Sequence, residues 1–167
     1  MSLIKIRKMK RSLGIWKGPG KEHIKTRESR YDTKRFEVSK DTIIDVYWKD
    51  LPNGYGPALS CFILGYELLK FDCFGEIDGH MHIDFSEFKE TKENRLFFHE
   101  KCRFEQIDRC ISEIERNMPY YTQRHQNQDV RLYQWDTETF GKHIPDIKAT
   151  MLEYLDRAQT HHEGHKG

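Results

Sequence analysis

Hydrophobic and polar residues alternate through the middle of the chain, from about Tyr31 to Phe85. Runs rich in β-branched and aromatic residues lie at 35–38, 42–48, 58–64, 67–74 and 81–85. Turn-forming residues separate these runs, most densely in the segment 50–57. Period-2 alternation bounded by Gly, Pro, Asn and Asp is typical of strands joined by tight turns. The pattern predicts five short antiparallel strands in a meander.

The pattern changes to a helical period after a charged connection at 87–94. Five apolar residues then recur at steps of three and four, namely Phe104, Ile107, Ile111, Ile114 and Met118. Such a stripe predicts an amphipathic helix over 102–118, which Pro119 is expected to end.

Two further elements are predicted beyond Pro119. Alternating aromatic residues indicate a short strand from Val130 to Trp135. Pro145, suited to a first helical position, precedes apolar residues at helical spacing and predicts a helix over 145–159. The fold class is therefore α+β, an antiparallel meander sheet of about five strands with two C-terminal helices packed on one face.

Length and composition favour one folded domain. At 167 residues the chain can bury a hydrophobic core but is short for two domains. Hydrophobic residues make up only 37%, yet aromatic residues at 13% bury large areas, which argues against global disorder. We expect a basic arm over 1–30, one α+β domain over 31–160 and a disordered tail over 161–167.

The sequence also predicts a cytoplasmic location. It has no apolar run of the roughly 18 residues that a membrane span requires. The N-terminus shows neither an uninterrupted apolar segment nor a small-residue cleavage site. The four cysteines have no CxxC spacing, and a domain of this size does not need disulfides, so we expect reduced thiols.

Charge is distributed unevenly along the chain. Residues 1–30 hold ten Lys and Arg against two Glu, a balance of +8, which leaves −7 for the remainder of a chain whose net charge is +1. Such an arm can bind a polyanion such as RNA, or lie on its own acidic domain. The residues predicted to contact nucleic acid in this arm are Lys8, Lys10, Arg11, Lys17 and Lys21.

The segment His80-Met81-His82-Ile83-Asp84 is the strongest candidate for chemistry. Alternate side chains of a strand point to opposite faces, so His80, His82 and Asp84 share one face and Met81 and Ile83 the other. We expect the apolar face to lie in the core and the histidines to face water or a cleft. Two imidazoles about 7 Å apart at their Cα atoms can bind one metal or bracket a phosphate.

Several interpretations of the two histidines remain open. The sequence resembles the His-x-His-x-Asp segment of metallo-β-lactamase-like hydrolases, but Phe85 stands where those have a further His. A simple metal site would need more ligands, with Asp72, Asp78, Asp84 and His99 as candidates that spacing does not separate. General acid–base cleavage of RNA requires no metal or cofactor, only a carboxylate to orient one imidazole. Two ordinary surface histidines are the remaining interpretation.

Residues about 42–118 resemble the TumE-type toxins of prokaryotic toxin–antitoxin loci. The resemblance lies in Gly65-Tyr66-Glu67, in Lys70-Phe71-Asp72 and in Gly79-His80-Met81-His82-Ile83. It implies a toxin-like, RNA-directed protein with a cognate antitoxin as partner. Carried over, the match touches Lys70, Asp72, His80 and His82.

Two functions are therefore expected. In the first, His80 and His82 act as acid and base or bind phosphate, Asp72 orients one of them, and Lys70 and the arm hold the RNA backbone. In the second, the protein is a non-enzymatic binding or accessory module whose arm docks on a partner. In either case an open sheet face at the histidines would favour a homodimer.

Overall fold

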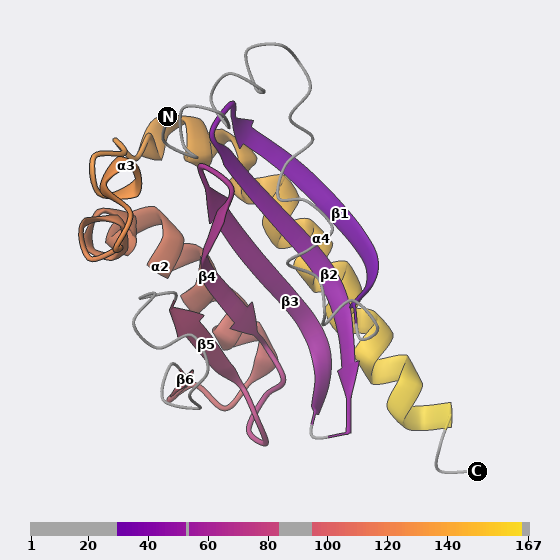
Figure 1. Cartoon of the computed structure of the whole chain (residues 1–167). Coiled ribbons are helices and arrows are strands. Elements are labelled where there is room, and N and C mark those ends of the chain that lie inside the picture. The colour runs from indigo at the N-terminus through magenta and orange to yellow at the C-terminus, as the bar shows by residue number, and fades with distance from the viewer. Residues whose placement is uncertain (1–29, 53, 84–94, 165–167) are drawn as a thin grey trace.

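The computed structural model of the chain describes residues 30–52, 54–83 and 95–164, with side chains described as far as Asp156 (Figure 1). Residues 1–29 of the basic arm, the segment 84–94 with Asp84, and residues 165–167 lie outside the described part, whereas Arg30, the last residue of the arm, is described.

One antiparallel sheet forms the centre of the described structure. Its strands are β1 (Arg30–Ser39), β2 (Thr42–Leu51), β3 (Gly54–Ile63), β4 (Tyr66–Asp72), β5 (His80–Ile83) and β6 (Arg95–Phe97). Each strand pairs with its neighbour in sequence, in the order β1-β2-β3-β4-β5-β6. The predicted α+β class and antiparallel meander are confirmed. β6 is an additional edge strand that the hydrophobic pattern did not predict.

The register of the strands separates an apolar face from a polar face. Ile44, Cys61, Leu69 and Ile83 are successive cross-strand partners from β2 to β5, and all four are buried in the main core cluster. Because side chains alternate along each strand, the residues between these positions lie on the other face. Met81 and Ile83 therefore lie in the core, as predicted.

Two long helices, α2 (Arg103–Gln123) and α4 (Thr137–Gly164), cover the apolar face (Figure 1). α4 packs against β1, β2 and β3, while α2 packs against β4 and against α4. Within the described residues, neither these helices nor the short α3 (Gln128–Arg131) has a stretch long and apolar enough to cross a membrane. The polar face lies opposite these helices, although its residues Tyr47, Ala58 and Ser60 are also buried.

The end of α2 differs from the prediction. Pro119 does not end the helix, which continues to Gln123. Proline removes one backbone hydrogen bond, but tertiary packing retains the last turn. Tyr121 and Thr122 in that turn are buried, and the Tyr121 hydroxyl donates a hydrogen bond of 2.7 Å to the Glu113 carboxylate.

The segment before Pro145 also differs from the prediction. The strand expected from Val130 to Trp135 is wrong, because Asn127 caps α3 there by accepting a hydrogen bond from the Asp129 backbone N–H at 2.8 Å. α4 begins at Thr137, not at Pro145, because the Asp136 carboxylate accepts from the backbone N–H of Thr139 at 2.9 Å. Carboxylates and amides in these positions satisfy the unpaired N–H groups of a first helical turn.

Candidate functional site

Two rows of cross-strand partners run across the polar face of the sheet. The first row consists of Tyr47, Ala58, Asp72, His80 and Phe97, one residue from each strand from β2 to β6. The second row, two residues away on each strand, consists of Asp45, Ser60, Lys70, His82 and Arg95. The rows place both histidines beside Asp72 and Lys70, so four residues predicted from the sequence come together.

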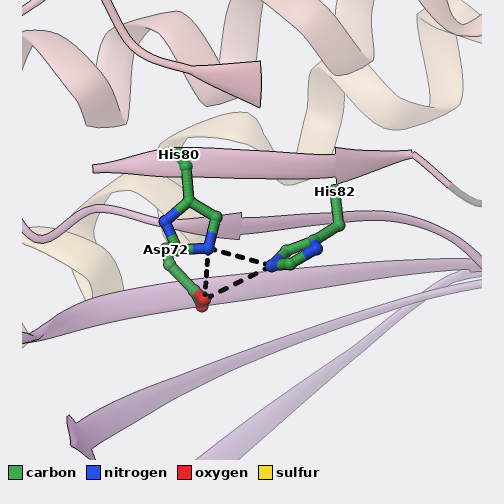
Figure 2. A group of neighbouring side chains, drawn as sticks. All are labelled: Asp72, His80 and His82. Carbon is green, nitrogen blue, oxygen red and sulfur yellow. Dashed lines mark hydrogen bonds and ion pairs between the residues drawn. The ribbon is translucent and has the colours of Figure 1, made fainter. Parts of the chain in front are cut away.

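Asp72, His80 and His82 converge on one point (Figure 2). The Nε2 atoms of His80 and His82 are 2.9 Å apart. Asp72 Oδ2 lies 3.3 Å from His80 Nε2 and 3.9 Å from His82 Nε2. Two imidazole nitrogens and one carboxylate oxygen therefore form a compact triangle at the boundary between β4 and β5.

A hydrogen bond from the loop between β4 and β5 sets the orientation of the His80 ring. His80 Nδ1 lies 2.6 Å from the backbone carbonyl oxygen of Asp78. A carbonyl only accepts, so Nδ1 must carry the hydrogen. In the neutral imidazole, Nε2 then presents its lone pair toward Asp72 and His82.

Gln106 on α2 holds this loop in place. Its side-chain Oε1 accepts from the Gly75 backbone N–H at 2.9 Å, and its Nε2 donates to the carbonyl oxygens of Gly75 and Glu100 at 3.0 and 2.7 Å. Gly79 packs so closely against the amide that a Cβ there would lie 2.2 Å from Gln106 Nε2. The loop that supplies the Asp78 carbonyl is thus fixed from the helical layer.

Two lysines approach the same carboxylate. Lys49 Nζ lies 2.6 Å from Asp72 Oδ2, and Lys70 Nζ lies 3.9 Å from it. Lys49 belongs to β2, so its side chain reaches across β3 to β4. The residue of β3 that pairs with Asp72 is Ala58, whose methyl group leaves room for this crossing. Lys49 is only 6% exposed.

Burial and the two lysines alter the ionisation of the cluster. Burial would raise the pKa of Asp72, but the charges of Lys70 and Lys49 outweigh it and hold that pKa below its ordinary value. Burial lowers the pKa of His80, and burial together with Lys70 lowers the pKa of His82 to about 3. Asp72 is therefore ionised and both imidazoles are neutral near pH 7.

The histidines and aspartates predicted from the sequence differ in their exposure and in their distance from the triangle. The histidines were expected to face water or a cleft; His80 is 1% exposed and does not face water, and its ring packs against those of Phe74 and Phe97. His82 is the outer member of the pair, with a side chain 30% exposed. Asp78 meets His80 on the Nδ1 side, away from the triangle. His99 is exposed and outside the cluster.

Comparisons with protein-family models, with curated proteins and with solved structures find no match to this chain. What the site does must therefore be inferred from its own chemistry.

Lys49 is the residue of this site that the sequence pattern did not predict. It alternates with Asp45 and Tyr47 along β2, and this alternation assigns it to the polar face of the sheet. Lys49 reaches Asp72 because of the register between the strands and the small size of Ala58. Neither feature can be predicted from the sequence of one strand alone. Phe97 and Arg95 were missed because β6 has only three residues.

Proposed function

We propose that this protein is an RNA-directed protein of toxin type, and that Lys49, Lys70, Asp72, His80 and His82 form its phosphate site. The observation that supports this proposal is the convergence of two lysines and two histidines around one buried carboxylate. Lysine is a common ligand of phosphate, and a neutral imidazole such as that of His82 has one N–H that can donate a hydrogen bond to it.

The distance between the histidines favours phosphate binding over a pair of acid and base. In an in-line displacement the attacking and leaving oxygens lie on opposite sides of phosphorus. An acid and a base must each approach its own oxygen to within about 3 Å. Nε2 atoms 2.9 Å apart contact each other and cannot flank a phosphate in this way.

His82 and Lys70 form the outer edge of the cluster. Their side chains are 30% and 17% exposed, whereas those of Asp72 and His80 are almost completely buried. A phosphate would therefore contact His82 and Lys70. Asp72 and Lys49 lie deeper in the cluster and fix the positions of its buried charges. His80 orients His82 through the contact between their rings.

Neighbouring residues on β6 favour a nucleic acid over an isolated phosphate. Phe97 is 65% exposed, and its ring centroid is 5.8 Å from that of His80. Arg95 is the cross-strand partner of His82. Exposed aromatic rings beside basic side chains stack bases and pair with the backbone of single-stranded nucleic acids. The basic arm, of which only Arg30 is described, would add further phosphate contacts.

The experiment is a binding and cleavage assay with labelled single-stranded RNA, with and without chelator. We expect His82→Ala and Lys70→Ala to weaken binding or cleavage at least tenfold. Lys142→Ala serves as the matched control, because Lys142 is an exposed lysine on α4, which covers the opposite face of the sheet. It should behave as the wild type.

Equal RNA binding by all four proteins would contradict a phosphate site at the histidines. If, in addition, none of them cleaves RNA, the alternative of a non-enzymatic binding or accessory module would stand in its place. Co-purification with a small protein encoded beside its gene would support the toxin type and the predicted antitoxin partner.

A further inference from the structure

The triangle formed by Asp72 Oδ2, His80 Nε2 and His82 Nε2 has the dimensions of a metal site. Its edges measure 2.9, 3.3 and 3.9 Å. A zinc ion holds nitrogen and oxygen ligands at about 2.0–2.2 Å in a tetrahedron, which separates neighbouring ligand atoms by about 3.4 Å. The three separations therefore lie within about 0.5 Å of the one that a shared ion would impose.

The atoms also point in the direction that an ion requires. The hydrogen bond from His80 Nδ1 to the Asp78 carbonyl leaves the Nε2 lone pair directed at the centre of the triangle. Metal-binding histidines typically donate their other ring N–H to a carbonyl or carboxylate in this way. The structure thus supplies both the ligand nitrogen of His80 and the group that orients it.

The Asp72 carboxylate can accept more contacts than the described residues make to it. Asp72 Oδ1 is buried and has no hydrogen-bond partner among the described residues. Asp72 Oδ2, which accepts a hydrogen bond from Lys49, lies 3.3 Å from His80 Nε2, and that nitrogen is hydrogen-bonded to His82 Nε2 at 2.9 Å. A cation at the centre of the triangle would replace the hydrogen bond between the two imidazoles and be coordinated by all three atoms. Lys49 would then donate to a carboxylate that is already a ligand, a common outer interaction at metal sites.

We propose that Asp72, His80 and His82 bind one divalent transition-metal ion of the zinc type. Two imidazoles favour zinc, cobalt or nickel over magnesium and calcium, which prefer oxygen ligands. No fourth side-chain ligand joins the group within the described part of the chain. Three protein ligands and one position for water or an anion are characteristic of zinc sites that bind substrates.

This inference goes beyond the proposed function and does not depend on it. The positive charge of the ion would add to that of Lys49 and Lys70, so an anion is the expected fourth ligand. A phosphate of RNA would fit that description, but the metal site can be tested in the absence of any nucleic acid.

The test uses the full chain, stripped with chelator and titrated with Zn²⁺ by calorimetry, and with Co²⁺ in the visible spectrum. We expect one ion per chain at this site and the intense absorption of four-coordinate cobalt. His82→Ala should weaken Zn²⁺ binding at least a hundredfold, and circular dichroism verifies its fold. Asp72→Asn, which retains the side-chain shape, should also weaken binding.

The histidine-rich C-terminus requires its own control, because it can bind metal adventitiously. A variant with His161, His162 and His165 all changed to Ala should retain the calorimetric site and the cobalt spectrum. The proposal would be overturned if the tail variant no longer binds the ion, or if the wild type gives only weak six-coordinate cobalt absorption. Zn²⁺ affinity unchanged in a folded His82→Ala would overturn it as well. If the metal site fails these tests but RNA still binds in the presence of chelator, the proposed phosphate site would stand without the metal.

Discussion

Lys49 and Asp72 form a buried ion pair that joins β2 to β4 across the intervening strand, with Nζ and Oδ2 separated by 2.6 Å. Both side chains are almost completely removed from solvent. Burial lowers the pKa of Lys49 to about 8, even though the charge of Asp72 opposes the shift. Each charge is therefore costly to bury and depends on its partner.

Replacing Lys49 by Met is expected to destabilise the fold. The methionine retains most of the apolar stem but leaves the Asp72 carboxylate buried beside Lys70 alone, at 3.9 Å. Removing one member of a buried pair typically costs on the order of 3 kcal/mol. Urea unfolding followed by circular dichroism measures the loss.

The control for Lys49→Met is Lys101→Met, which removes an exposed ion pair with Glu76. Its unfolding free energy should match the wild type, because exposed pairs are screened by solvent. If the Lys49→Met protein were as stable as the control, Lys70 or His80 would be sufficient to stabilise the buried Asp72 carboxylate in the absence of Lys49.

Two glycines should respond in opposite directions to substitution by alanine. At Gly79 the added Cβ would meet the Gln106 amide, which is fixed by three hydrogen bonds to the backbone, so we expect a loss of about 1–3 kcal/mol. At Gly141 in α4 nothing lies within 4 Å of the Cβ, so we expect a gain of roughly 0.5–1 kcal/mol from helix propensity. Thermal unfolding of both variants provides the comparison. A stable Gly79→Ala would mean that the hydrogen bonds of Gln106 can be rearranged at little cost.

Glu113 should make the stability of the protein sensitive to acid. Burial would raise the pKa of this carboxyl, but hydrogen bonds from Asn117 and Tyr121 and the charge of Arg109 hold it below its ordinary value. The ionised form therefore stabilises the folded state, fully above the unfolded pKa of about 4.5 and progressively less as pH falls below it.

The comparison for this pH dependence is Glu113→Gln. Below about pH 4.5 the unfolding free energy of the wild type should fall more steeply than that of the variant. Urea titrations at a series of pH values measure both slopes. If the unfolding free energies of the two proteins fell with the same slope, carboxylates other than Glu113 would be responsible for the acid sensitivity.

The basic arm should contribute to the salt dependence of RNA binding. Deleting residues 1–29 removes nine Lys and Arg residues and retains Arg30, which begins β1 and pairs with Glu67. On single-stranded nucleic acid, every phosphate that the protein ceases to neutralise reduces the slope of log affinity against log salt by about 0.7. Fluorescence anisotropy over a salt series measures the slope. An unchanged slope would indicate that the arm does not hold RNA and favour its docking on the acidic domain.

Alternation along one strand was sufficient to predict the face that carries the histidines. His80 and His82 are separated by Met81, which lies in the core as expected. Asp72 was one of four candidate ligands that spacing did not separate, and the sequence resemblance also included it; the register of β4 against β5 pairs it directly with His80. These relationships are local, because they involve one hairpin and its loop.

The burial of His80 could not be predicted in the same way. It depends on Phe74 at the end of one strand and on Phe97 from β6, an element too short for its alternation to be recognised. The ion pair between Lys49 and Asp72 likewise requires the register of three strands. Long-range pairing, rather than local pattern, decides both features.

The sheet pairs its strands in the order in which the chain is synthesised. All five residues of the proposed phosphate site are made before α2 and α4, whose helices cover the apolar face. During translation the nascent sheet therefore exposes a broad apolar surface until the last third of the chain has emerged. The apolar face of the sheet is thus covered only after residues remote from the proposed site have been made.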